Sequence, residues 1–311
     1  MKRISLFLIF LLAVPSFGAP INNAARNVIP YDIQQLIVVD YRALNDSPTA
    51  LQLKDKVLPQ PLKEFETALK GAGIDPQKDV EQLVFASYRD KGAKEGLRVV
   101  GVAQGNFAGQ KVKARLLKQK IKGTKYRTSV MYPLAAGLDM SLIDDSTMIF
   151  GTESAVKMAL DARDSEVRSL NANTTITDMM TGVDTEAVWS VLDNKGTQTM
   201  LKSALGEVAQ LADYDMIKNR LVGSRYAIKF NDGFKFDLDV ITSDSLTAAT
   251  LSSILKAGVM LRQTTASDSE KLALSSVKVT SDSHDLKLKF EADNTKFQAL
   301  LKSDLFAAVS R

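Results

Sequence analysis

The sequence predicts an α+β protein built from two similar ferredoxin-like modules in tandem, each an antiparallel sheet with helices on one face. Three observations support this fold class. The 311 residues are 45% hydrophobic and 24% charged, which is typical of a folded protein of about two domains. Short runs that alternate apolar and polar residues are bounded by turn residues, as in strands. Segments with apolar residues at helical spacing separate these runs in the same order in both halves.

The N-terminus has the pattern of a Sec-type signal peptide over residues 1–18. Two basic residues precede the almost wholly apolar stretch Ile4 to Val14, and Ser16 and Gly18 stand at positions −3 and −1 of a cut after Gly18. Cleavage after Ala19 and an uncleaved anchor are the alternatives, although eleven apolar residues span only about half of a bilayer core. We therefore expect a periplasmic or secreted mature chain with no transmembrane span. Its net charge is +2, because removal of two basic residues lowers the value of +4.

Residues 27–163 form the first predicted module. Leu36 to Val39 is a buried-strand pattern, Ser47-Pro48 supplies a helix N-cap followed by a first-turn proline, and Gly71 ends the helical stretch. In chain order the expected elements are a strand at 35–41, a helix from 47 to about 69 interrupted by prolines, strands at 80–88 and 97–103, a Lys-rich helix with apolar Val112, Leu116 and Leu117, strands at 126–134 and 147–150, and a closing helix capped by Thr152.

Residues 187–311 repeat this order as the second module. Asn231-Asp232-Gly233 is a strong hairpin signal, and the strand from Phe234 to Ile241 alternates apolar with charged residues, which predicts one buried and one solvated face. The expected elements are strands at 187–192, 224–230, 234–241, 274–280 and 286–290, with helices at 197–211, from Ser245 to about 261, and after Asn294. Each module therefore contains the βαββαβ pattern of ferredoxin-like folds plus a βα unit. Residues 164–186 are a polar linker in which Ile176, Met179 and Met180 predict a short helix.

Residues that usually carry catalysis or bind metals are scarce. The chain has no Cys, and its one histidine, His284, lies in a predicted hairpin tip. Consecutive Ser283, His284 and Asp285 point in different directions on an extended turn, whereas the members of a catalytic triad meet through tertiary folding. A zinc site would need carboxylates almost alone, which zinc rarely accepts. We therefore predict no metal and no cofactor.

Three further patterns match catalytic or ligand-binding motifs only in part. Ser154-x-x-Lys157 matches the Ser-Lys motif of penicillin-recognising enzymes, but the same spacing recurs twice elsewhere and the companion motifs are absent. The stretch Gly105 to Gly109 lacks the spacing of a phosphate-binding loop and is typical of a strand-to-helix turn. The carboxylate pairs Asp144-Asp145, Asp213-x-Asp215 and Asp237-x-Asp239 are interpreted as solvated surface. No catalytic residue is predicted.

The strongest charge feature of the mature chain is a basic run from Lys111 to Lys125. Lysines at these spacings are typical of the solvated face of an amphipathic helix, which is the interpretation we favour from the sequence. The alternative is contact with anionic lipid headgroups or cell-wall polymer, for which the candidate residues are Lys111, Lys113, Arg115, Lys118 and Lys120. A net charge of +4 over 311 residues is too weak for nucleic-acid binding to be expected.

Several short segments carry a resemblance to known sequences. They are Gly73-Ile74-Asp75-Pro76 with Asp79-Val80, Gly101-Val102 with Gly105 and Phe107, Phe150-Gly151, and Trp189-Ser190-Val191. Through them the mature chain resembles a group of uncharacterised secreted two-module α+β proteins of acidobacteria and other soil bacteria. The resemblance implies an exported α+β protein in two parts, and it implies no activity and no functional residue.

These observations favour a non-enzymatic exported protein that binds or scaffolds a partner at the bacterial envelope. The partner, an envelope protein or a small ligand, is expected in the groove between the modules or on an exposed sheet face. One alternative is a carrier of a hydrophobic or anionic small ligand in the inter-module groove, which requires an apolar cavity with a few polar groups. The other is a hydrolase that uses carboxylates or the Ser-Lys pair, which requires buried, converging titratable groups.

Overall fold

The computed structural model describes residues 18–45, 47–48, 50–51, 60–89, 96–134, 137–205, 217–230 and 233–301. The first half contains, in chain order, α1 (Asn23–Val28), β1 (Ile33–Asp40), α2 (Tyr41–Asn45), α4 (Gln60–Ala72), α5 (Pro76–Asp79), β2 (Val80–Arg89), β3 (Leu97–Gly105), α6 (Gly109–Lys118), β4 (Thr124–Tyr126), β5 (Ser129–Pro133), β6 (Asp139–Leu142), β7 (Thr147–Gly151) and α7 (Glu153–Arg163). The 3-10 helix η2 (Leu170–Ala172) and α8 (Thr174–Met180) follow. The second half contains β8 (Val188–Asp193), α9 (Asn194–Leu205), β9 (Leu221–Lys229), β10 (Phe234–Thr242), α12 (Ser245–Thr265), α13 (Asp268–Leu274), β11 (Val277–Asp282), β12 (Asp285–Ala292) and α14 (Asn294–Leu301).

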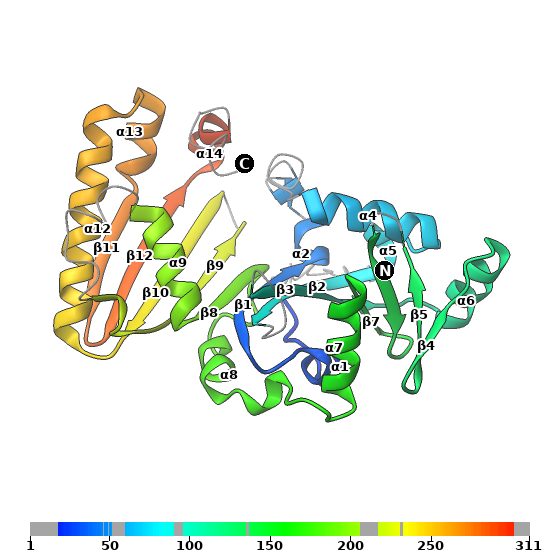
Figure 1. The fold of residues 1–311 in the computed structure, drawn as a ribbon. Helices are drawn as coiled ribbons and strands as arrows, with labels where there is room; N and C mark the ends of the chain where they lie inside the picture. Colours follow the sequence, from blue (N-terminus) through cyan, green and yellow to red (C-terminus); the bar gives the residue numbers. More distant parts are fainter. Residues whose placement is uncertain are drawn as a thin grey trace, which may run out of the picture.

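All of these strands belong to one 12-stranded sheet, as Figure 1 shows. Its order is β11-β12-β10-β9-β8-β1-β2-β3-β7-β6-β5-β4, and every pair of neighbours is antiparallel. The α+β class is confirmed. One sheet was expected in each half, but the structure has a single sheet. The halves are joined because β1 pairs with β8, with Val38 opposite Trp189.

The strand order repeats on either side of the β1–β8 pair. The strands β1-β2-β3-β7-β6 on one side correspond to β8-β9-β10-β12-β11 on the other. A ferredoxin-like unit is not confirmed in either half, because the split pattern places another strand between two parallel, helix-joined strands. Here β1 and β2, which helices join, are antiparallel neighbours, with Val38 opposite Val84. The module boundaries at residues 164–186 stay a prediction.

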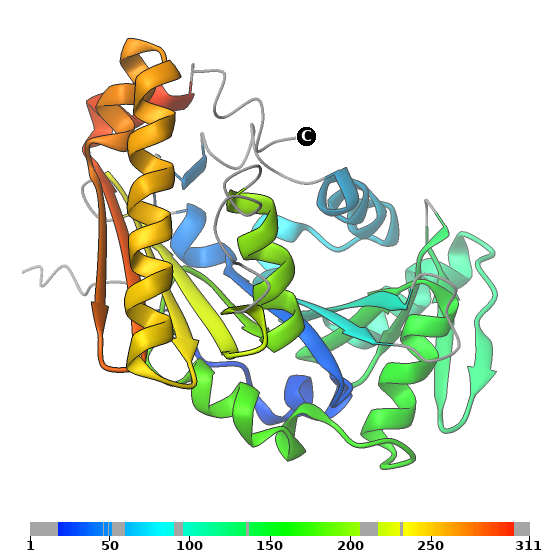
Figure 2. The same cartoon turned by 60° about the vertical axis from the view of Figure 1, so that its left-hand side comes forward.

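Helices cover both faces of the sheet in the first half (Figures 1 and 2). α1, α7 and α8 pack on the face that carries Leu36 and Val38, whereas α4 and α6 pack on the opposite face. The expectation of one covered face is therefore wrong for this half. The reason is visible in β2, where Leu83-Val84-Phe85 places apolar side chains on both faces in succession, as in a strand buried on both sides.

In the second half, α9 and α12 pack on the face of the sheet that carries Leu238 and Val240. The opposite face of β10 carries Asp237 and Asp239, so the predicted alternation of apolar and charged faces is present, but the charged face is half-buried rather than solvated. The hairpin signal at Asn231-Asp232 lies outside the described residues. β9 and β10 on either side of it are antiparallel neighbours, as expected.

One core cluster crosses from the first half into the second. Trp189 of β8, which is fully buried, shares this cluster with Leu36 and Val38 of β1. The short helix predicted in the linker is α8, and its apolar residues Ile176, Met179 and Met180 are buried in the same cluster. The halves therefore share a core as well as a sheet. Among the described residues, no helix combines the length and the apolar character needed to cross a bilayer.

Candidate anion-contacting site

The predicted Lys-rich helix is α6, and its packing explains why its cations face solvent. Val112 and Leu116 are buried in the core cluster that also contains Leu69 of α4. Leu117, which was expected on the same buried face, is instead 70% exposed. Residues 112 and 116 lie about one turn apart, whereas residue 117 lies a further ~100° around the helix. The expectation for Leu117 is therefore wrong.

The start of α6 is held by a residue far away in sequence. The N-cap residue Ala108 has a left-handed conformation, with φ 42°, and has no side chain that can cap the helix. Asp145, in the turn between β6 and β7, instead accepts a hydrogen bond from Gly109 N at 3.1 Å. A carboxylate at a helix N-terminus satisfies a free N–H group and interacts favourably with the helix dipole. This contact fixes the first turn of α6 on the sheet.

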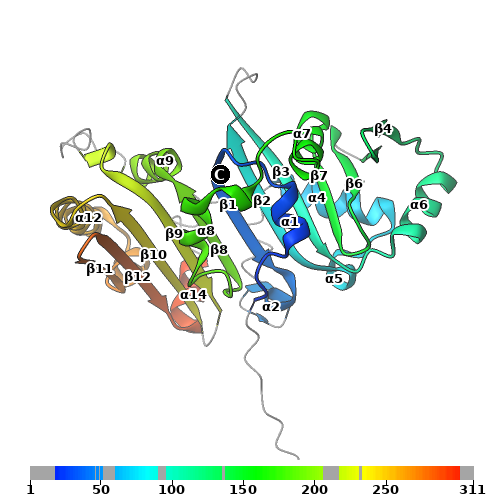
Figure 3. The same cartoon turned by 90° about the horizontal axis from the view of Figure 1, so that it is seen from below.

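Seven basic residues lie on α6, in the segment after it and in β4, and we call this part the basic end. Figure 3 shows α6 and β4 at one end of the molecule. All are exposed, and none forms an ion pair with a residue that the structure describes; they are Lys111, Lys113, Arg115, Lys118, Lys120, Lys122 and Lys125. The stretch 106–138 explains this, because it contains eight Lys or Arg residues and no Asp or Glu. Since the predicted mature chain has a net charge of +2, the remainder of it carries −6.

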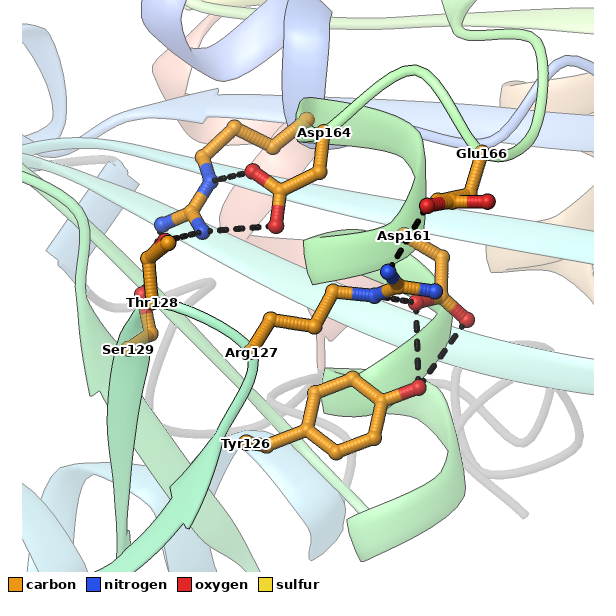
Figure 4. Close-up of polar contacts among 8 residues, drawn as sticks. Tyr126, Arg127, Thr128, Ser129, Asp161, Asp164 and Glu166 are labelled. Carbon is orange, nitrogen blue, oxygen red and sulfur yellow. Dashed lines mark hydrogen bonds and ion pairs between the residues drawn. The ribbon is translucent and has the colours of Figure 1, made fainter.

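The eighth cation of this stretch, Arg127, has acidic partners and ties the β4–β5 hairpin to α7 (Figure 4). Arg127 forms ion pairs with Asp161 and with Glu166, the latter at 2.9 Å. The Tyr126 hydroxyl also donates to Asp161, at 3.0 Å. The hairpin beside the basic end is therefore anchored to a helix that packs on the sheet.

A pocket of about 450 Å³ lies beside α6, near the junction of α4 and α5. The side chain of Arg115 lies against Gly73, where a Cβ atom would come within 2.3 Å of Arg115 Cδ. Gly73 has φ +83°, a left-handed conformation that glycine adopts without strain. Gln119 Nε2 donates to Gly71 O at 2.9 Å and ties the end of α6 to the end of α4. The pocket is lined by Lys70, Gly73, Ile74, Asp75, Gln77 and Arg115.

This pocket carries an excess of positive charge. Its carboxylate, Asp75, accepts a hydrogen bond from Gln77 N at 3.1 Å and pairs with Lys78 at 3.2 Å. The hydrogen bond from Lys78, followed by that from the Gln77 backbone, lowers the pKa of Asp75. Asp75 is therefore ionised at neutral pH and has its own counter-charge. Lys70 and Arg115 form no ion pair with any described residue, so both can attract an external anion.

A second pocket, of about 370 Å³, is mainly apolar. Leu97 and Val99 of β3 line it and are 43% and 48% exposed. The other lining residues are Phe85, Arg98, Gly101, Leu138, Phe150, Gly151 and Thr152. Both pockets described here are lined by residues of the first half alone, so neither is the inter-module groove that the carrier hypothesis expects.

The residues that matched catalytic patterns make structural contacts. His284 is exposed at the tip of the β11–β12 hairpin, and its carbonyl oxygen accepts from Thr242 N at 2.9 Å. Ser154 Oγ accepts a hydrogen bond from an arginine of β3. Lys157 pairs with Glu153 at 2.6 Å, and this hydrogen bond raises the pKa of Lys157. A lysine that acts as a general base needs the opposite shift.

The carboxylate pairs are also explained by local structure where they are described. Asp145 caps α6, and Asp144 accepts from a backbone N–H of its own turn at 2.7 Å. Asp237 and Asp239 are half-buried and pair with basic residues of β9. Asp213-x-Asp215 lies outside the described residues. In the part of the chain that the structure describes, no group of three or more metal-ligating side chains is present.

Comparison with known proteins shows a similarity of fold alone. No protein-family model matches the chain, and no curated protein matches it. Crystal structures of TP0453 in crystal forms III and I are similar, with TM-scores of 0.52 and 0.51 at 8% sequence identity. These matches cover 89% and 90% of this chain and 98% and 96% of those chains. The chain therefore shares its overall fold with these structures over nearly the whole length of each.

Proposed function

We propose that the chain is an exported, non-enzymatic binding protein of the bacterial envelope that contacts an anionic surface through its basic end. The observation that carries the proposal is the set of seven exposed cations that have no acidic partner among the described residues. Surfaces that only need to be soluble intersperse charges of both signs. A surface patch of one sign attracts a partner of the opposite sign.

Anionic lipid headgroups are the partner that fits this end best, because an apolar side chain lies among the cations. Leu117 is 70% exposed beside Lys118. Helices that bind membrane surfaces combine basic residues with apolar side chains that enter the headgroup region. A soluble polyanion would leave Leu117 in water. The apolar side chain therefore favours a lipid surface over a cell-wall polymer.

The expected binding is weak and sensitive to salt. Each Lys or Arg close to an anionic bilayer contributes about 1 kcal/mol, and this contribution falls off within the Debye length. Contact through the five candidates Lys111, Lys113, Arg115, Lys118 and Lys120 therefore supplies about 5 kcal/mol. That value corresponds to a Kd between about 1 mM and 1 μM. Such a contact is reversible.

The test is flotation of the mature chain with vesicles of phosphatidylcholine and phosphatidylglycerol, at low and at physiological ionic strength. Replacing Lys113, Lys118 and Lys120 by Glu is expected to abolish flotation at low salt. A matched control uses three exposed lysines of the second half. Replacing Lys202, Lys256 and Lys278 by Glu makes the same change in net charge. If the basic-end variant floats like the wild type, the solvated-face interpretation of α6 is correct and this proposal is wrong.

The carrier alternative has one supporting observation, the apolar pocket beside Leu97 and Val99. Its volume of about 370 Å³ lies within the range of small-ligand sites, roughly 300–1,000 Å³. Displacement of an environment-sensitive apolar dye tests it. Val99→Glu would place a charge in the pocket and should remove dye binding if the pocket is the site. Equal dye binding by both proteins would exclude this pocket as the carrier site.

A further inference from the structure

The residues on either side of the predicted cleavage site are hydrogen-bonded to the folded chain. Gly18 N donates to Thr185 O at 2.7 Å, and Ala19 N donates to Asp40 Oδ2 at 3.4 Å. Gln82 Nε2 of β2 donates to Ala19 O. Ala19 therefore lies where the end of β1, the side of β2 and the segment before β8 come together.

Several buried oxygen atoms lie around the Gly18–Ala19 segment. Asp40 is 7% exposed, and no basic side chain in the described residues pairs with it. Gln82 Oε1, on a side chain that is 3% exposed, has no hydrogen-bond partner. The carbonyl oxygens of Thr185 and Glu186 lie 3.2 and 2.7 Å from the position of a Cβ atom at Gly18. A buried carboxylate is normally paired with a cation, and no cation of the described residues pairs with Asp40.

We infer that a signal peptidase hydrolyses the Gly18–Ala19 bond and that the new α-ammonium group of Ala19 forms an ion pair with Asp40. Water adds across the peptide bond, which leaves a carboxylate on Gly18 and an amine on Ala19. An α-amine with an ordinary pKa of about 7.7–8.0 is mostly protonated at neutral pH, and an adjacent carboxylate favours the protonated form further. Three N–H donors then replace one, and they face the oxygens that the departure of Gly18 uncovers.

The inference decides between the two cleavage positions that the sequence leaves open. Cleavage after Ala19 would remove both the nitrogen beside Asp40 and the carbonyl oxygen that accepts from Gln82. That would leave two buried polar side chains without these partners, which is unfavourable for a neutral group and more so for a charge. Export through the Sec machinery precedes folding, so the burial of Gly18 in the folded chain does not hinder its removal.

The first experiment is the intact mass of the protein recovered from the periplasm of an export-competent bacterium that expresses all 311 residues. The inference rests on the proposed export, and this measurement separates the two. A chain that begins at Ala19 supports both. A processed chain that begins elsewhere supports export and overturns the inference. An unprocessed chain that stays in the cytoplasm overturns both.

The second experiment compares the urea unfolding of purified chains that begin at Ala19 and at Gly18. The longer chain keeps the Gly18 N–Thr185 O bond but moves its ammonium group away from Asp40. We expect the Ala19 chain to be the more stable of the two, with an unfolding equilibrium constant about tenfold lower. Asp40→Asn is expected to abolish this difference. Asn keeps the acceptor that Ala43 N uses at the start of α2, and it removes both the charge and the second oxygen, which faces Ala19 N.

Greater stability of the Gly18 chain, or a difference that survives Asp40→Asn, would overturn the inference. If the Asp40→Asn chain does not fold, N-terminal acetylation of the Ala19 chain replaces it, since acetylation removes the same charge pair from the other side. Acetylation is then expected to raise the unfolding equilibrium constant by about tenfold. An unchanged constant would again refute the ion pair.

Discussion

Two glycines at the end of α4 should respond in opposite directions to the same substitution. Gly71 lies within α4, and nothing lies within 4 Å of a Cβ atom added there. Gly71→Ala is therefore expected to raise the free energy of unfolding by about 0.5–1 kcal/mol, through the better helix propensity of alanine. Gly73 has φ +83°, where an L-residue costs about 1–2 kcal/mol. Gly73→Ala should therefore destabilise the protein by at least this amount.

The contact between Gly73 and Arg115 adds a second cost, which can be measured separately. A Cβ atom at residue 73 would lie 2.3 Å from Arg115 Cδ and 2.6 Å from Nε, so the arginine must leave its place on the turn. In an Arg115→Ala background only the backbone cost remains. We therefore expect Gly73→Ala to be less destabilising in that background than in the wild type, as contacting residues are not additive.

Urea unfolding measures both effects, with the fluorescence of Trp189 as the probe. Trp189 is the single tryptophan of the chain and is fully buried, so its emission reports loss of the shared core. A neutral Gly73→Ala would show that residue 73 does not adopt the left-handed conformation. An equal cost in both backgrounds would show that Arg115 does not rest on Gly73, and the geometry of the basic pocket would then be wrong.

Substitutions at two further aspartates test how one helix of each half is capped. Asp145→Ala should lower the free energy of unfolding by about 0.5–2 kcal/mol, because Gly109 N at the start of α6 loses its acceptor. Asp145→Asn keeps an acceptor oxygen, so it should lower the free energy of unfolding by less in the same urea titration. Asp244 caps α12, and the hydrogen bond from Thr247 N, followed by that from the Thr247 hydroxyl, lowers the pKa of Asp244 from 3.8 to about 2. The stabilisation that the ionised Asp244 provides is therefore present above about pH 4 and lost as pH falls through about 2. The melting temperature should consequently fall less between pH 5 and pH 2 in Asp244→Asn than in the wild type.

The long strands with a clear apolar pattern are the elements that the sequence predicts best. The strand expected at 234–241 is β10 (Phe234–Thr242), and the one expected at 80–88 is β2 (Val80–Arg89). By contrast, the stretch 126–134 was expected to be one strand and is a hairpin instead. Its turn places Arg127 at φ +50°, without the Gly or Asn that usually marks such a turn. The ion pairs of Arg127 with α7 stabilise this conformation, and they are invisible in the local sequence.

The arrangement of the strands was predicted less well than the strands themselves. Periodicity shows which side of a strand is buried, but it does not show which strand lies beside it. A helix between β1 and β2 is compatible with a split parallel pair and with the antiparallel neighbours that the structure has. The decisive contact, between β1 and β8, joins residues about 150 positions apart in the sequence, such as Val38 and Trp189. No local signal encodes that pairing.

In the candidate site, too, the features encoded by neighbouring residues were predicted, and those formed by residues distant in sequence were not. The spacing of the lysines predicts an exposed face on α6, and the five candidate residues are exposed in the structure. The pocket beside them was missed, because Lys70 and Arg115 come from different helices and meet around the turn at Gly73. The one available signal was the absence of acidic residues from 106–138, a stretch longer than a single helix.

One proposal concerns the middle of the sheet and the other concerns one edge of it, and this makes their tests independent. The pairing of β1 with β8 forms a seam between the two halves. At one end of this seam, Arg89 of β2 forms an ion pair with Asp193 of β8. At its other end Asp40 N donates to Ala187 O at 2.8 Å, next to the proposed Ala19 ammonium. The basic end lies beyond β7 and β6, at the far edge of the sheet (Figure 3). Because substitutions that share no partner are usually additive, charge reversal on α6 should change vesicle binding without changing the unfolding cycle at Asp40. A coupling between the two measurements would mean that the seam, and with it the N-terminus, takes part in binding.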